Sequence, residues 1–260
     1  MTSDRVRLER EGPVARIVLD HASTMNSISP LVVETLRSMI SEAEKSARVL
    51  VITGANGNFS SGADLSPDRP VGQKGVDAGL RLETHFNPLM TDLRNLSIPW
   101  ISAVRGAAAG VGCSIALSAD LIVASRSAYF LQAFRRIGLI PDGGSAFVLS
   151  RGAGRVRAME MMLLGDKVPA ATALEWGLIN RCVDEGKFDA EVESIATKLA
   201  SGPTYSLALT RKSAWAAIES EYAASLALER KYQCEAGNSE DFIEGVKAFR
   251  EKRPARFVGR

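Results

Sequence analysis

The 260-residue sequence predicts a mixed α/β fold that continues into a helical C-terminal region. Continuous apolar runs, which are typical of buried strands, lie at residues 49–53, 100–104 and 120–124. After several short elements the pattern becomes helical almost to the end of the chain, in a stretch too thin to fold alone. We therefore predict an α/β core over residues 1–188 and a helical region over residues 189–260.

The first elements are a hairpin and a capped helix. Residues 6–10 and 14–19 alternate apolar and polar side chains on the two sides of a glycine turn, as paired strands do. Ser29 followed by Pro30 predicts a helix start, because serine is a favoured N-cap and proline is tolerated at the first helical position. The apolar face of this helix continues to about Ala47.

The middle of the chain alternates loops with short elements. A loop rich in glycine and small residues follows the run at 49–53, and a polar stretch with two prolines and three glycines occupies residues 66–79. We interpret the second stretch as a mobile surface loop. Helices are expected at roughly 80–96, 146–150, 155–164 and 170–176, and a short strand at 178–183.

Composition and charge exclude several classes of protein. The net charge is only +2, with basic and acidic residues interspersed, whereas nucleic-acid or membrane-surface binding needs a patch of one sign. The three cysteines are odd in number and far apart, so they form neither a metal site nor a disulfide framework. The first residues are charged, and no stretch is apolar for long enough to span a membrane. We expect a soluble cytoplasmic protein without a metal.

Two loops of small residues are candidates for chemistry. Residues 60–64 follow the run at 49–53, and residues 106–113 follow the run at 100–104. Glycine and alanine let a ligand approach backbone N–H groups, and a helix N-terminus adds partial positive charge. If each loop donates one N–H to a common point, they form an oxyanion hole, in which each donor is worth about 3–4 kcal/mol. Tight packing of helix on sheet explains the same residues equally well.

Asp142 stands in a tight turn before the next helix, within the segment GLIPDGG. A carboxylate there could act as an acid or base on a ligand held by the two loops. Aspartate is also a favoured N-cap, which is its more common use before a helix. The residues alone leave both interpretations open.

Three segments together resemble the crotonase (enoyl-CoA hydratase/isomerase) superfamily, namely SSGADL, AVRGAAAGVGCSIAL and GLIPDGGS. The likeness runs from LDHASTMNSI through GDKVPAATALEWGLIN to GVKAFREKR and so covers essentially the whole chain. The resemblance implies an α/β spiral of repeated ββα units with a helical C-terminal trimerisation region. It also implies an acyl-CoA thioester as substrate, no separate cofactor, and a homotrimer or dimer of trimers.

The same resemblance implies roles for individual residues. The backbone N–H groups of Ala63 and Val111 would form the oxyanion hole, and Asp142 would be the catalytic carboxylate. Two loops would line the CoA adenine and pantetheine, and the C-terminal region, often of a neighbouring subunit, would cover the CoA. The implied substrate and CoA contacts are Ser23, Thr24, Met25, Ser61, Gly62, Asp64, Leu65, Gly110, Phe134, Phe249 and Lys252.

Two positions depart from the pattern of the hydratases in this superfamily. Those enzymes use two glutamates, and the corresponding places here hold Ser114 and Phe134. Hydration needs one group to activate water and another to protonate the α-carbon. Serine and phenylalanine supply neither group, so we do not expect a standard hydratase.

A single carboxylate suffices for isomerisation. Asp142 would remove a proton from the acyl chain, the oxyanion hole would hold the enolate, and the same carboxyl would return the proton at the other end. Apolar neighbours such as Phe134 would raise the pKa of Asp142 and strengthen it as a base. The resemblance therefore implies an acyl-CoA isomerase that moves a double bond or opens a ring epoxide.

Other interpretations stay open. Asp142 could act as a nucleophile, as in the related 4-chlorobenzoyl-CoA dehalogenases, or the enzyme could be hydratase-like. A member of the superfamily that binds CoA esters without turnover is a third possibility. His85 stands beside Phe86 in a helical pattern, where a partly buried or surface role is more frequent than an active-site role.

Overall fold

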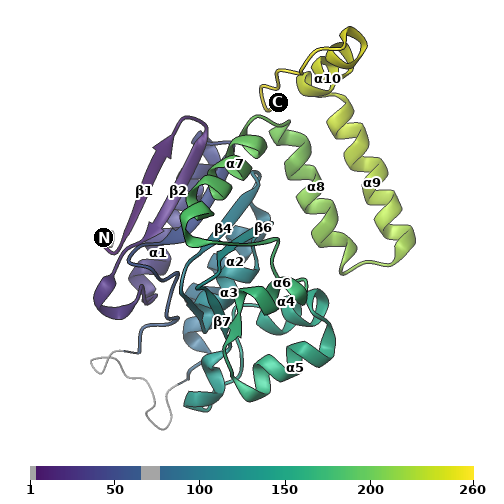
Figure 1. Cartoon of the computed structure of the whole chain (residues 1–260). Coiled ribbons are helices and arrows are strands. Elements are labelled where there is room, and N and C mark those ends of the chain that lie inside the picture. The colour runs from purple at the N-terminus through teal and green to yellow at the C-terminus, as the bar shows by residue number, and fades with distance from the viewer. Residues whose placement is uncertain (1–3, 66–76) are drawn as a thin grey trace.

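The computed structural model describes residues 4–65 and 77–260. Its centre is a six-stranded sheet in the order β1-β2-β3-β4-β6-β9 (Figure 1). The first two strands form the predicted antiparallel hairpin, and every later pair of neighbours is parallel. The strands are β1 (Val6–Glu11), β2 (Val14–Leu19), β3 (Val49–Gly54), β4 (Trp100–Val104), β6 (Leu121–Ser125) and β9 (Arg181–Val183).

A second sheet consists of three short strands in the order β5-β7-β8. These strands are β5 (Ala107–Ala109), β7 (Tyr129–Leu131) and β8 (Val168–Pro169). The chain passes from β4 into β5 and from β6 into β7 within a few residues, and each pair is followed by a helical segment. This alternation between two sheets produces the repeated ββα unit that the resemblance implied.

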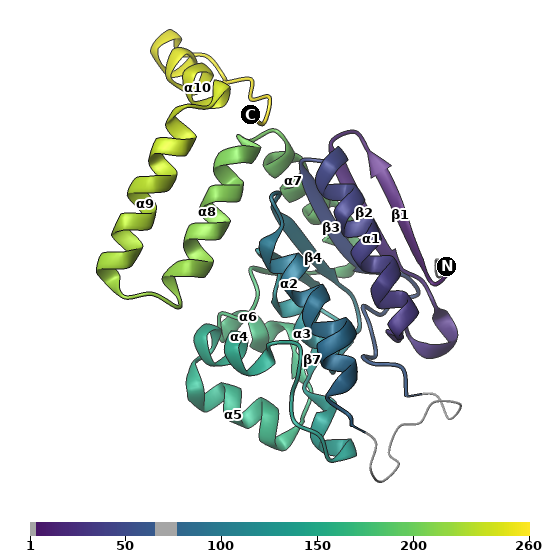
Figure 2. The ribbon, with the colours of Figure 1, turned by 180° about the vertical axis from the view of Figure 1, so that it is seen from behind.

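Helices cover both faces of the main sheet. On one face α7 (Phe188–Ala200) packs against Val51 and Ile101. Since successive strand residues point to opposite faces, β3 and β4 are buried on both sides, which explains their continuous apolar runs. Figure 2 shows the opposite face, which is covered by α1 (Pro30–Ser46), α2 (Asn87–Asn95) and α3 (Val111–Leu117).

The helices predicted to start at Pro30 and to span 146–150, 155–164 and 170–176 are present, with ends that agree to within one or two residues. Ser29 is the N-cap of α1, and its hydroxyl accepts a hydrogen bond from the Val32 N–H. The shorter helical segments are α4 (Ser145–Gly152), α5 (Gly154–Leu164), α6 (Ala170–Glu175), η1 (Ala22–Thr24), η3 (Ala133–Ile137) and η4 (Glu185–Lys187).

Two elements differ from the prediction. The helix expected over 80–96 contains a π-helical turn at Leu82–Phe86, because Pro88 has no N–H to continue the regular pattern. The strand expected over 178–183 is shorter, since the chain first completes the turn after α6, where Leu178 N–H donates to Ala173 O. Most of the predicted mobile loop, residues 66–76, lies outside the described residues.

Three C-terminal helices project from the core, as Figures 1 and 2 show from opposite sides. Arg211 anchors the first of them, because its buried guanidinium pairs with Asp120 and donates to the Leu93 and Leu96 carbonyls. The next helix has no buried residue. The three are α8 (Thr204–Ala217), α9 (Tyr222–Gly237) and α10 (Glu240–Glu251).

The predicted division between residues 188 and 189 stays a prediction about folding units. In the structure the helix after it, α7, packs on the sheet, and the projecting part begins only with α8. In the described parts of the chain, no helix has both the length and the apolar character that crossing a bilayer requires.

Candidate active site

The two predicted small-residue loops meet in the structure. Ser60 and Ala108 form an isolated parallel bridge, with Ser60 N–H donating to Ala107 O at 2.9 Å. Beyond this bridge the loops touch at Gly62 and Gly110, whose φ angles are 99° and 54°. A Cβ on Gly62 would lie 2.8 Å from Ala109 O, so only glycine allows this approach.

Ala63 and Val111 directly follow these two glycines. The groups flanking the Ala63 N–H are used, since Ile28 N–H donates to Gly62 O and Asp64 N–H donates to Ile28 O. Val111 is the first residue of α3, where no preceding turn offers an acceptor. Within residues 4–65 and 77–260, neither the Ala63 nor the Val111 N–H donates a hydrogen bond. The contact between the loops thus presents two unpaired backbone donors.

Asp142 lies beside the start of α3. The turn that carries it is pressed against that helix, because a Cβ on Gly143 would lie 2.8 Å from Ser114 Cβ and 3.3 Å from Val111 Cγ2. The Asp142 Oδ1 atom is buried and has no hydrogen-bond partner among the described residues. Burial raises the pKa of this carboxyl to about 6.

The interpretation of Asp142 as a helix cap is wrong. The N-cap of α4 is Gly144, and no side chain accepts a hydrogen bond there. Instead the main-chain carbonyl of Asp142 accepts from Ser145 N–H at 3.1 Å. The carboxyl is therefore left free to interact with a ligand.

Both positions that hold glutamate in the hydratases are buried. The Ser114 hydroxyl donates to Asp142 O at 3.0 Å, and Phe134 lies in η3 as part of the core. Ser114 also lies 2.7 Å from Ser145 Oγ, which accepts from Gln132. Gln132 and Ser145 could not be predicted, because their pairing depends on tertiary packing and follows no periodic pattern.

The predicted CoA-binding turn is tied to the first small-residue loop. Ser61 N–H donates to Met25 O at 2.8 Å, and Ser61 Oγ donates to Thr24 O at 2.7 Å. Ser23 lies in the same turn, η1, while the Met25 and Leu65 side chains are exposed. The structure thus brings these predicted contacts next to Gly62 and Ala63.

Asp64 is buried near Arg5, with 3.7 Å between the charged groups. Ser60, which sequence reasoning missed, supports the same loop. Its buried hydroxyl donates to Asn26 O at 2.8 Å and accepts the Gly62 N–H at 3.1 Å. The run of small residues hid this role, since serine there also suits close packing.

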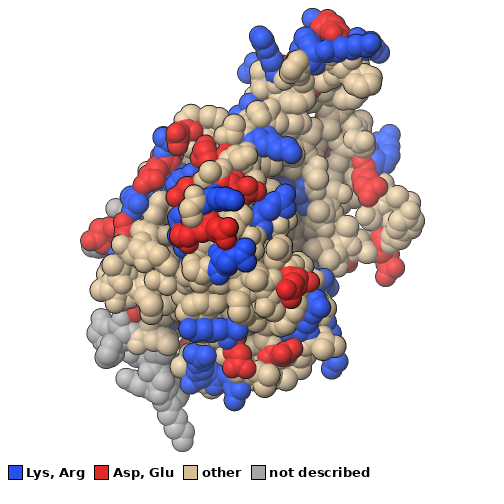
Figure 3. Space-filling model, viewed as in Figure 1, with Lys and Arg blue, Asp and Glu red and all other residues tan. Residues whose placement is uncertain are grey.

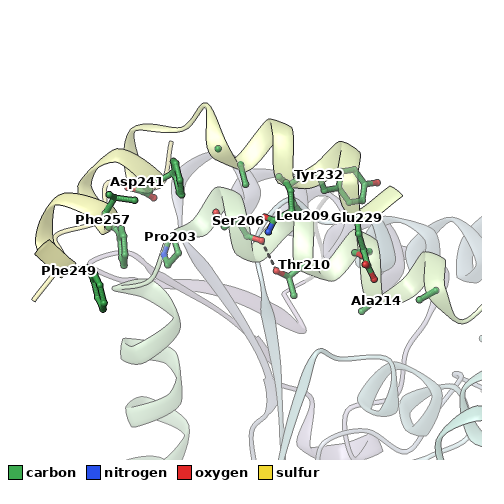
Figure 4. Close-up of a pocket in the computed structure, with 18 residues that line it drawn as sticks. Pro203, Ser206, Leu209, Thr210, Ala214, Glu229, Tyr232, Asp241, Phe249 and Phe257 are labelled. Carbon is green, nitrogen blue, oxygen red and sulfur yellow. Dashed lines mark hydrogen bonds between the residues drawn. The ribbon is translucent and has the colours of Figure 1, made fainter. Parts of the chain in front are cut away.

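Two predicted contacts lie away from this site in the same chain. Phe249 is 84% exposed on α10, and Lys252 follows the end of that helix. Figure 4 shows Phe249 at one end of a cavity of about 980 Å³ between α8 and the helices α9 and α10. Apart from Phe249, the residues lining this cavity include none of the predicted site residues.

His85 and the buried Cys113 both have local explanations. His85 Nδ1 lies 2.7 Å from Thr84 Oγ1, and His85 Nε2 lies 3.7 Å from Glu34. Burial raises the pKa of the Cys113 thiol to about 12, so it is a packing residue. No group of three or more His, Cys, Asp or Glu side chains in the described part of the chain could hold a metal ion.

On the face shown in Figure 3, basic and acidic residues are interspersed.

Comparison with known proteins identifies the family. The Enoyl-CoA hydratase/isomerase family model matches residues 9–260. The chain is 39% identical to the "Probable enoyl-CoA hydratase" of Rhodobacter capsulatus over 100% of both chains. It is also 39% identical to the 1,2-epoxyphenylacetyl-CoA isomerase of Escherichia coli, over 96% of this chain and 97% of that one.

A solved structure agrees with these relatives. The enoyl-CoA hydratase of Bacillus anthracis superposes with a TM-score of 0.91 at 25% identity, over 99% of this chain and 100% of that chain. The chain therefore belongs to the enoyl-CoA hydratase/isomerase family and has the crotonase fold, as predicted. It is an enzyme of the crotonase superfamily that acts on acyl-CoA thioesters.

Proposed function

We propose that this protein is an acyl-CoA isomerase in which Asp142 is the only catalytic acid/base. The observation that carries the proposal is the buried Oδ1 of Asp142 next to α3: among the described residues, neither this oxygen nor the first N–H of α3 has a hydrogen-bond partner. A pKa of about 6 suits a group that must both take and return a proton near neutral pH.

The reaction divides between three groups. The Asp142 carboxylate takes a proton from the acyl chain, and the electron pair moves towards the thioester oxygen. The N–H groups of Ala63 and Val111 hold the resulting enolate oxygen. The electrons then return, the protonated Asp142 gives its proton to the other end of the three-carbon unit, and the double bond has moved. Ser114 and Phe134 stand where the hydratases have their two glutamates, so neither position supplies a carboxylate to activate water.

We assign the thioester contacts to the residues around these groups and to the C-terminal helices. The CoA would lie along η1 and the loop after β3, with Phe134 against the acyl chain. Phe249 and Lys252 would reach it from another copy of the chain in a homotrimer or dimer of trimers in the cytoplasm. No cofactor is needed, because CoA is part of the substrate.

The substrate is either a 3-enoyl thioester or a thioester whose ring carries a 1,2-epoxide. The first becomes a 2-enoyl thioester, and in the second the epoxide opens and the ring expands. The name of the E. coli relative, 1,2-epoxyphenylacetyl-CoA isomerase, supports the second choice. The name of the R. capsulatus relative instead supports hydration, for which the chain lacks the two glutamates. Turnover of 3-hexenoyl-CoA, 2-butenoyl-CoA and 1,2-epoxyphenylacetyl-CoA would distinguish these activities.

The decisive variant is Asp142→Asn. The amide keeps the shape of the side chain but cannot take a proton, so we expect isomerisation to fall by about 10²–10⁴-fold. Affinity for the thioester should hardly change, because binding is spread over the CoA. Asp166→Asn, which removes an exposed carboxylate after α5, is the matched control and should retain full activity.

Two results would contradict the proposal. The first is an Asp142→Asn variant that retains most of its isomerase activity. The second is a wild type that hydrates 2-butenoyl-CoA as fast as it isomerises any substrate in the panel.

A further inference from the structure

Three buried side chains form a continuous chain of hydrogen bonds that ends at the main chain of Asp142. Gln132 Nε2 lies 3.1 Å from Ser145 Oγ, which lies 2.7 Å from Ser114 Oγ. Ser114 Oγ in turn lies 3.0 Å from Asp142 O. All three side chains are almost completely removed from solvent.

The hydrogen bonds in this row all point in one direction. The Gln132 amide nitrogen can only donate, so Ser145 Oγ accepts from it. The Ser145 hydroxyl is then able to donate a hydrogen bond to Ser114 Oγ, and the Ser114 hydroxyl donates to the Asp142 carbonyl oxygen. Gly110 O, at 3.3 Å, is a longer alternative acceptor for Ser114. Donors aligned in one direction strengthen one another in a buried setting.

The two polar groups of Asp142 are treated in opposite ways. Its main-chain carbonyl accepts two hydrogen bonds, from Ser114 Oγ and from Ser145 N–H. Its carboxyl Oδ1 accepts none from the described residues. The peptide that follows is further fixed by Gly143, which is pressed against Ser114. The turn is thus held through its backbone, and the carboxyl is presented without a partner.

We propose that Ser114 is a positioning residue for the reaction. It stands where the hydratases have a glutamate, and it acts through the main chain of Asp142 without touching the substrate. Ser145 and Gln132 orient its hydroxyl. This inference rests on the proposed isomerase function, in which the carboxyl of Asp142 carries the proton.

The first test removes single hydroxyl groups. Ser114→Ala should lower kcat for isomerisation by about tenfold, because a displaced base meets the acyl chain in a poorer geometry. The KM for the thioester should stay within about twofold, since the CoA contacts are untouched. Ser118→Ala is the matched control, because Ser118 lies at the end of the same helix and donates to a main-chain carbonyl, Ile115 O, at 2.8 Å.

The second test asks whether the residues act as one unit. The double variant Ser114→Ala/Ser145→Ala should lose no more activity than the less active of the two single variants, because both hydroxyl groups act on the Asp142 carbonyl. Additive losses in kcat would overturn the proposed chain. A Ser114→Ala variant with an unchanged kcat would also overturn it. So would a KM that rises by as large a factor as kcat falls, or a Tm that falls far more than that of Ser118→Ala.

Asp142→Asn separates the two proposals. If Asp142→Asn is inactive while Ser114→Ala has the kcat of the wild type, the inference fails and the isomerase proposal stands. If Asp142→Asn remains active, the isomerase proposal itself fails, and the inference fails with it.

Discussion

The surroundings of Asp142 and the projecting helices are built in opposite ways. Around Asp142 the side chains of Ser60, Ser114 and Gln132 are buried, and each donates at least one hydrogen bond. On the projecting helices, large apolar side chains such as Tyr222 and Phe249 are 79% and 84% exposed. The polar side chains of the first region are packed within their own chain, whereas the apolar side chains of the second need another surface to cover them.

The largest expected difference between the two regions appears when one methyl group is added to a glycine in each of them. A Cβ on Gly112 would lie 2.7 Å from Ser60 Cβ, and Ser60 holds the Gly62 N–H. Gly112→Ala should therefore cost about 1–3 kcal/mol of stability and displace the Ala63 donor, lowering isomerisation by about 100-fold. Thermal unfolding and turnover measure the two effects.

Gly237→Ala is the matched substitution in the projecting part. Nothing lies within 4 Å of a Cβ there, and alanine favours the helix, so Tm should stay the same or rise. Equal losses of stability in the two variants would remove the contrast between the regions.

Much of the fold could be predicted because its signals are local. The capped start of α1 and the hairpin β1–β2 follow from short-range patterns, and β3 and β4 from apolar runs. The π-helical turn was missed and β9 was predicted too long, since each depends on a single backbone hydrogen bond. The role of α7 was also missed, because amphipathic periodicity does not say which surface a helix covers.

The site divides in the same way. Glycine and small residues after two buried strands predicted the meeting of the loops at Gly62 and Gly110. The free carboxyl of Asp142 could not be distinguished from a helix cap, since the two differ by one hydrogen bond. The buried row of hydrogen bonds from Gln132 through Ser145 to Ser114 has no sequence signal, because these side chains come together only in the tertiary structure.

The second prediction concerns what covers the projecting helices. Tyr222 and Leu226 are exposed one turn apart on α9, so we expect this face to associate with another copy of the chain. Light scattering should give a mass well above that of one chain, 27.9 kDa. The pair Tyr222→Asp/Leu226→Asp should raise the dissociation constant about 30-fold or more. Tyr222→Phe, which keeps the apolar surface, should not, and a single-chain mass for the wild type would reject the idea.

The third prediction compares two carboxyls by pH. Burial raises the pKa of Asp142 to about 6, so the folded chain holds a proton between about pH 4 and pH 6 that the unfolded chain has lost. Stability therefore falls as pH rises through this window. Asp142→Asn removes that loss and should be more stable than wild type by about 1 kcal/mol at pH 8, but not at pH 4. Wild-type kcat/KM should rise with pH, with its midpoint at about 6.

The carboxyl of Glu244, on α10, should affect the pH dependence of stability in the opposite direction to that of Asp142. Hydrogen bonds from Arg253 lower the pKa of this carboxyl to about 2, so its contribution to stability is present above its ordinary pKa and disappears as pH falls towards 2. Glu244→Gln should lower Tm at pH 8 and have little effect at pH 2. Unfolding scans of both variants across pH would test the opposite signs, and shifts of the same sign would contradict this account.

The smallest expected effect is that of Phe249→Ala. If Phe249 covers CoA in the site of another copy, its loss should raise the KM for the thioester by about threefold and leave kcat unchanged. Ile243→Ala, an exposed apolar residue on the same helix, is the matched control and should change neither constant.

Mixing two variants tests whether Phe249 acts between copies. The Phe249→Ala chain carries an intact Asp142, and the Asp142→Asn chain carries an intact Phe249. In mixed assemblies an active site of the first kind can be covered by Phe249 from the second, so the KM should move back towards the wild-type value. An unchanged KM after mixing, with mixed assemblies confirmed by mass, would place the contact within one chain. The exposed face of α10 would then have a role other than completing a neighbouring site.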